Sequence, residues 1–161
     1  MQSTTELELR LQEIDKQLAE LQANRYELLD DIQKMKNESV SARISDCGLA
    51  SNMHIIMFAK DLHDSSIVKL FTIKDMCWKE QEIDCIEGAY TETYYGYMYR
   101  TYQTRLSFTA FLEHKDVYKM YVCDEDQFKL MQLQLCEHNL DHTNIDEYEA
   151  AINCSALRTI G

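Results

Sequence analysis

The chain contains no proline and only four glycines. Reversals of chain direction therefore rely on Asn, Asp, Ser and those few glycines, and no flexible or Pro-rich linker is present. No apolar run approaches the roughly 18–20 residues that a membrane-spanning helix needs. The N-terminus also lacks the basic-then-apolar arrangement of a secretory signal. These absences predict a cytoplasmic protein with no membrane partner.

Basic residues are scarce, since 16 Lys and Arg stand against 28 Asp and Glu and give a formal net charge of −12. Contact with nucleic-acid phosphates requires clustered Lys and Arg, so direct nucleic-acid binding is not expected. An acidic surface instead suits a protein partner with a basic face.

Motifs of catalysis are lacking as well. The sequence has no Gly-rich phosphate loop, G-x-S-x-G or H-E-x-x-H pattern. His63, Asp64 and His114 have acid or base side chains, but no spacing brings them together. We therefore favour binding over catalysis and name no catalytic residue and no cofactor, and a small enzyme of unknown reaction is a second alternative.

The six cysteines form no C-x-x-C pair, which together with the absent signal predicts free thiols. Cys136, His138 and His142 are residues of the zinc-ligand type. No second close ligand pair accompanies them, so no metal site is predicted, although the sequence leaves zinc open.

The strongest positive signal is an apolar seam near the N-terminus, whose members are spaced alternately four and three residues apart. The seam consists of Leu7, Leu11, Ile14, Leu18, Leu21, Arg25, Leu28, Ile32 and Met35. This spacing is typical of a coiled coil. Ser3 and Glu6 have the capping-box pattern of a helix start, and Asn37 supplies a stop. Residues 1–38 are therefore predicted to be a coiled-coil oligomerisation helix.

Flanking charges bear on the pairing. In a parallel pair, Arg10 faces Asp15 of the other chain, and Asp31 faces Lys36. Arg25 interrupts the apolar seam and so restricts register and chain number. We expect a homo-oligomer, with the number of chains and their direction left open; the alternative is a helix that folds back onto its own domain.

The remaining residues, 39–161, are predicted to form an α+β domain with an antiparallel sheet and C-terminal helices on one face. Glu87 and Gly88 are read as a turn, and 114–116 as another. The predicted strands are 53–59, 66–73, 82–86, 105–112 and 117–123, and the predicted helices are 124–139 and 143–157. A strand is the alternative within 124–139, because its apolar residues also fit a period of two.

Residues 88–105 hold six of the ten tyrosines and few charges. Ordinary sheet packing is the first interpretation of this tyrosine ribbon, with alternate rings on opposite faces of one strand. One alternative is a surface patch that faces another protein. The other alternative is a site that sequesters a nucleotide-like anionic small molecule between rings and guanidinium groups. The ligand-binding residues of the small-molecule alternative are Tyr95, Tyr97, Tyr99, Arg100, Tyr102 and Arg105.

A second candidate surface is acidic, and its residues are Asp124, Glu125, Asp126, Glu137 and Asp141. Together with the seam it suggests a homo-oligomeric, non-enzymatic binding protein that neutralises or regulates a basic protein partner. Small size, acidity and missing catalytic motifs would suit an inhibitor of the viral or mobile-element kind.

Overall fold

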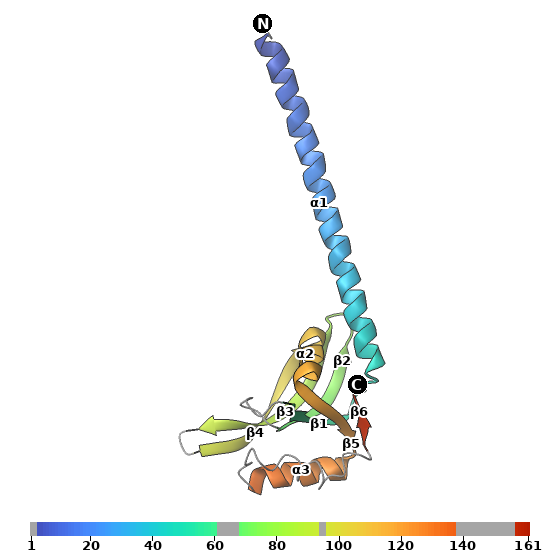
Figure 1. Ribbon diagram of the computed structural model, residues 1–161, viewed down its shortest axis with the longest axis vertical. Helices are drawn as coiled ribbons and strands as arrows, with labels where there is room; N and C mark the ends of the chain where they lie inside the picture. Colours follow the sequence, from blue (N-terminus) through green and yellow to red (C-terminus); the bar gives the residue numbers. More distant parts are fainter. Residues whose placement is uncertain (1–2, 61–67, 94–95, 138–156) are drawn as a thin grey trace. The chain divides into compact units, whose positions relative to one another are not determined.

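The computed structural model describes residues 3–60, 68–93, 96–137 and 157–161 (Figure 1). The chain divides into two compact units, Met1–Ser39 and Val40–Gly161. The architecture is α+β, as predicted, with a long N-terminal helix followed by a six-stranded antiparallel sheet and further helices.

The long helix α1 spans Thr4–Asp46. At its start the Ser3 hydroxyl accepts a hydrogen bond from the Glu6 amide, as the capping pattern predicts. The predicted stop near Asn37 is wrong, because α1 continues to Asp46; Gly48, two residues later, has a φ of 62° and takes the left-handed conformation that commonly ends a helix. The extra turns form because Ile44 is fully buried in the core of the second unit.

The sheet has the order β4-β3-β2-β1-β5-β6, and every neighbouring pair is antiparallel. Its strands are β1 (His54–Ala59), β2 (Val68–Cys77), β3 (Glu82–Thr93), β4 (Gly96–Ser107), β5 (Tyr118–Cys123) and β6 (Arg158–Thr159). The central strand β1 is buried on both faces, which explains why residues 53–59 read as a continuous apolar run.

The tyrosine ribbon is a hairpin of two strands and not the single strand assumed from its alternation. Residues of β3 pair with β4 from Glu82 opposite Ser107 to Thr93 opposite Gly96. The predicted turn at Glu87 and Gly88 is therefore wrong, since β3 passes straight through both residues.

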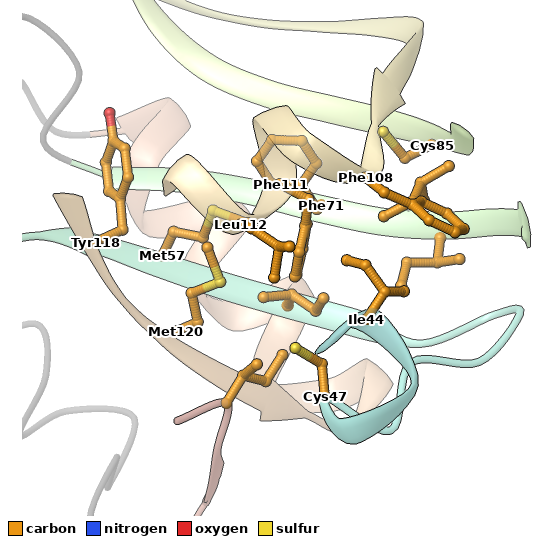
Figure 2. Close-up of a cluster of buried hydrophobic side chains, with 14 of the residues drawn as sticks. Ile44, Cys47, Met57, Phe71, Cys85, Phe108, Phe111, Leu112, Tyr118 and Met120 are labelled. Atoms are coloured by element: carbon orange, nitrogen blue, oxygen red, sulfur yellow. The ribbon is translucent and has the colours of Figure 1, made fainter. Parts of the chain in front are cut away.

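Two hydrophobic clusters cover opposite faces of the sheet. Successive residues of β1 belong alternately to the larger and the smaller cluster, as expected when side chains of a strand point to alternate faces. Helix α2 (Phe108–Val117) contributes Phe108, Phe111 and Leu112 to the larger cluster (Figure 2). Helix α3 (Glu125–Glu137) contributes Met131 and Leu135 to the smaller cluster. Helices α2 and α3 therefore lie on opposite faces of the sheet (Figure 1). The prediction of helices on one face concerned 124–139 and 143–157, and the second of these lies almost wholly outside the described residues.

The predicted strand 105–112 is wrong from Phe108 onward, where helix α2 begins, and the predicted turn 114–116 also lies within α2. The strand β4 ends at Ser107, whose hydroxyl accepts a hydrogen bond from the Ala110 amide at 3.1 Å and so caps α2. Phe108, Phe111 and Leu112 then face the core at helical spacing.

Helix α3 confirms the prediction made from Asp124 and Gln127. The Asp124 carboxylate accepts from the Gln127 amide at 2.8 Å, and the Gln127 side chain accepts from the Asp124 amide at 3.3 Å. This reciprocal cap satisfies two otherwise free amides at the helix start. The predicted last helix, 143–157, lies almost wholly outside the described residues.

Candidate functional site

Tyr99, a ribbon residue, packs onto the sheet. Its ring contacts the smaller hydrophobic cluster, on the face that α3 covers. It also lies over Gly88, because a Cβ added to that glycine would meet the Tyr99 hydroxyl and lie 2.6 Å from its Cζ. The glycine is thus required in mid-strand by the close approach of a ring, which is the packing role expected for tyrosines in a sheet.

Tyr102 lies on the other face, opposite Glu87 of β3. Burial, the Glu87 charge and a hydrogen bond to Glu87 raise the pKa of the Tyr102 phenol above its usual value. The residue as a whole is 45% exposed.

The two arginines of the ribbon differ in their surroundings. Arg105 donates from Nε to Asp84 at 3.0 Å, and its Nη1 is 3.7 Å from Glu82. Those carboxylates hold the guanidinium and raise its pKa, with the Asp84 hydrogen bond as the main cause. Arg100 lies opposite Ala89 and is exposed.

Among the described members of the predicted ribbon site, the side chains do not all face one position within a single chain. Tyr99 and Tyr102 face opposite sides of the sheet, and Arg105 is held by carboxylates of its own chain. Tyr95 lies outside the described residues, and the side chain of Tyr97 does as well.

The structure adds a polar cluster that the sequence analysis missed. Glu87 is only 8% exposed, and its carboxylate lies 3.5 Å from the Lys69 ammonium. Lys69 also lies over the ring of Tyr118, with 5.3 Å between Nζ and the ring centroid. Since Lys69 and Tyr102 together compensate the buried carboxylate, we assign this cluster a structural role.

A signal for Glu87 was present in the sequence. Ile83, Cys85 and Ala89 share its face of β3 and are all buried, so an acid falls in the middle of an inward-facing series. Burial, followed by the charges of Glu87 and Asp84, raises the pKa of the Cys85 thiol to about 12. A thiol of this kind stays protonated at neutral pH and is a poor nucleophile.

The predicted acidic surface is described only in part. Asp124, Glu125 and Asp126 are exposed at the start of α3. Lys129 lies 2.6 Å from Glu125 and lowers its pKa through a hydrogen bond and its charge. The side chain of Glu137 and the whole of Asp141 lie outside the described residues.

The residues with zinc-ligand side chains are also described only in part. Cys136 is an exposed free thiol on α3, whereas His138 and His142 lie outside the described residues. Within the described ranges, no group of three or more His, Cys, Asp or Glu side chains is arranged to hold a metal ion.

The seam residues lie on α1 within the first unit. Their apolar side chains are all exposed in the single chain, by 49% for Ile32 up to 69% for Met35. Arg25 is exposed as well. Exposed apolar side chains that form a continuous stripe along a helix are typical of a binding surface.

No helix in the described part of the chain combines the length and the apolar character that a membrane span requires. Comparison with models of protein families, with curated proteins and with solved structures finds no match to this chain.

Proposed function

We propose that the protein is a homo-oligomeric binding protein in which α1 forms a parallel coiled coil and each chain displays one α+β unit. The observation that carries this proposal is the exposure of the complete apolar seam on α1. In water such a stripe is unfavourable, and a second copy of the same helix covers it in register.

The energetic gain is large enough to hold chains together. Each Leu, Ile or Met side chain contributes about 1.5–3 kcal/mol when it is fully buried. Eight such side chains lie in the seam. Even partial burial therefore supplies on the order of 10 kcal/mol per helix, to be set against the cost of association.

The charges beside the seam favour parallel chains in register. Arg10 would lie near Asp15 of the neighbouring chain, and Asp31 near Lys36. These exposed pairs contribute only about a few tenths of a kcal/mol each, so they select the direction more than they stabilise the assembly. Arg25 places a charge in the middle of the seam and disfavours shifted registers.

Association is tested by the paired substitution Leu18→Lys and Leu21→Lys, with Ala19→Lys and Ala23→Lys as the matched control. Both variants add the same charge to the same two turns of α1, but only the first pair lies in the seam. Four lost leucine contacts per dimer cost about 6–12 kcal/mol, which weakens association at least about 10⁴-fold.

Sedimentation should accordingly show a monomer for the seam variant and an unchanged oligomer for the control. Helix content by circular dichroism should fall in the seam variant, because a single helix without a packing partner is marginal in water. An unchanged oligomer in the seam variant would contradict the proposal.

We further propose that the assembly neutralises or regulates a protein partner with a basic face, without catalysis and in the cytoplasm. The exposed carboxylates of Asp124, Glu125 and Asp126 support this, since an oligomer presents several copies and gains from multivalency. The unactivated thiol of Cys85 also fits a role in binding more than one in catalysis.

This partner-binding role is tested by reversing the three carboxylates to lysine, with Glu8, Glu13 and Glu20 of α1 reversed as the control. Proteins retained by the immobilised wild type should dissociate as salt is raised, and the α3 reversal should fail to retain them. Retention of the same proteins by both reversal variants would refute the acidic surface as the binding site.

A further inference from the structure

A thiol and an amine from distant parts of the sequence meet in the second unit. Cys47 follows the last residue of α1, and Lys115 lies in the last turn of α2. The Lys115 Nζ donates a hydrogen bond to the Cys47 sulfur, with 3.6 Å between the two atoms. The amine also donates to the Gly161 carbonyl oxygen at 2.7 Å, and the thiol donates to the Arg43 carbonyl oxygen at 3.3 Å. Main-chain contacts on both sides therefore hold the two groups against each other.

The sulfur of Cys47 has electrostatic surroundings unlike those of Cys85. Burial and the charges of Glu87 and Asp84 raise the pKa of the Cys85 thiol. Cys47 instead accepts a hydrogen bond from an ammonium group. Such a hydrogen bond stabilises the negative charge that sulfur carries when a thiol loses its proton to react. We therefore expect Cys47 to be the more readily oxidised of these two buried thiols.

The site favours a small oxidant. Cys47 is only 3% exposed and belongs to the larger hydrophobic cluster (Figure 2). Lys115 is half-buried and lines a hollow of about 240 Å³, together with Ile160 and Gly161 among others. A water molecule takes up about 30 Å³ and hydrogen peroxide is little larger, so the hollow admits peroxide to the Lys115 side chain that contacts the sulfur.

We propose that Cys47 and Lys115 form an oxidative modification site, at which hydrogen peroxide oxidises the thiol and the lysine amine then binds the sulfur in a sulfenamide bond. The contact at 3.6 Å is what carries this inference, because the nitrogen already lies next to the sulfur that it would attack. A sulfenic acid that has a nitrogen nucleophile beside it condenses with that nitrogen.

The two steps balance as follows. In the first, the sulfur bonds to one peroxide oxygen, the O–O bond breaks, and the second oxygen leaves as water with the thiol proton; sulfur is oxidised by two electrons and peroxide is reduced. In the second, the ammonium releases one proton to solvent and its nitrogen attacks the sulfur. The S–O bond breaks, and the hydroxyl leaves as water with one amine hydrogen. This second step needs no further oxidant, and thiols reverse the whole modification by reducing the S–N bond.

This modification site goes beyond the proposed function, because both residues belong to the unit Val40–Gly161 of one chain. The bond can form whether or not α1 associates. A failure of the coiled coil would leave this proposal standing, and the reverse also holds.

The test treats the full chain with hydrogen peroxide, blocks the remaining thiols by alkylation under denaturing conditions, and maps tryptic peptides by mass. We expect a peptide that joins Cys47 to Lys115, lacks two hydrogens relative to the sum of its parts, and is uncleaved at Lys115. Treatment with a reducing thiol should release both parts. Absence of the joined peptide, with Cys47 recovered as a thiol or as a sulfinic or sulfonic acid, overturns the proposal.

Two variants show whether the named amine is responsible. Lys115→Arg keeps the positive charge and removes the primary amine. Lys60→Arg is the matched control, because Lys60 contacts the same part of α2 by donating to the Lys115 carbonyl oxygen. The joined peptide should be lost in Lys115→Arg, where dimedone should label Cys47 as a sulfenic acid instead, and should persist in Lys60→Arg. Capture of Cys47 by another amine in the Lys115→Arg variant would overturn the assignment.

The wild type provides a further readout that needs no variant. A bond between positions 68 residues apart restricts the unfolded chain. The oxidised protein should therefore unfold at a urea concentration higher by about 1 M or more, and reduction should reverse this shift. A lower midpoint in the cross-linked protein would show that the bond distorts the fold, which would contradict the geometry on which the proposal rests.

Discussion

The contact between Gly88 and Tyr99 predicts a strong coupling between these two residues. Gly88→Ala places a Cβ against the Tyr99 hydroxyl and 2.6 Å from Cζ, so the ring must leave its position on the smaller hydrophobic cluster. Forced repacking of this kind costs about 1–3 kcal/mol of the free energy of unfolding. In a Tyr99→Val background the clash is gone, and the same substitution should stabilise by about 0.5–1 kcal/mol, because alanine has less chain entropy to lose.

The predicted coupling free energy is therefore about 1.5–4 kcal/mol, measured by a double-mutant cycle. Urea unfolding can be followed through the single tryptophan, Trp78, which packs edge-on against Phe108 of α2 at 5.2 Å between ring centroids. All four proteins must be compared at one chain concentration, since association shifts apparent stability. A coupling below about 0.5 kcal/mol would refute the packing role assigned to Tyr99.

Three further predictions follow from other contacts. Asp124→Ala should lower the free energy of unfolding by about 0.5–2 kcal/mol, because it removes the cap of α3. Asp124→Asn should lower it by much less, because asparagine can still cap the helix. Chemical denaturation measures both losses, and equal losses would contradict the capping role. Burial lowers the pKa of His54 below 6.5, although the charge of Glu125 opposes this shift. The unfolded state therefore binds the proton more readily than the folded state, and the protein loses stability as the pH falls through about 6.5. His54→Gln should flatten that part of the stability profile, measured by denaturation between about pH 7.5 and 5.5, and an unchanged profile would contradict the lowered pKa. A thiol reagent at neutral pH should label the exposed Cys136 rapidly but Cys85 only after unfolding, because Cys85 is buried and its pKa is raised to about 12. Mass mapping of the labelled peptides measures both rates. Equal labelling rates in the folded protein would contradict the burial of Cys85.

Local signals were sufficient for several elements. The apolar run of β1 and the paired cap of Asp124 and Gln127 are complete within a few residues, and both elements form where they were predicted. The start of α1 also depends only on nearby residues, because the Ser3 hydroxyl accepts a hydrogen bond from the Glu6 amide.

The errors arose where tertiary packing decides between two local patterns. Leu106, Phe108 and Leu112 alternate as in a strand, but Phe108, Phe111 and Leu112 also fit a helix, and the core selects the helix after Ser107. From the sequence, Gly88 was predicted to form a turn. The structure shows instead that a glycine is needed there within a strand, because the Tyr99 side chain occupies the space of a Cβ.

The contact between Lys60 and Lys115 had no sequence signal at all. Lys60 and Lys115 are 55 positions apart and become neighbours only because β1 and β5 pair in the sheet. The apolar seam, by contrast, is visible in the sequence, but a single chain shows only that it is exposed.

The most direct test of the proposed assembly is native mass spectrometry of the full chain at several concentrations. The account predicts an oligomer whose mass is an integral multiple of the 19.0 kDa chain and which dissociates on dilution or with the substitutions Leu18→Lys and Leu21→Lys. A monomer at every concentration would contradict the coiled coil and, with it, the multivalent display of the α+β unit.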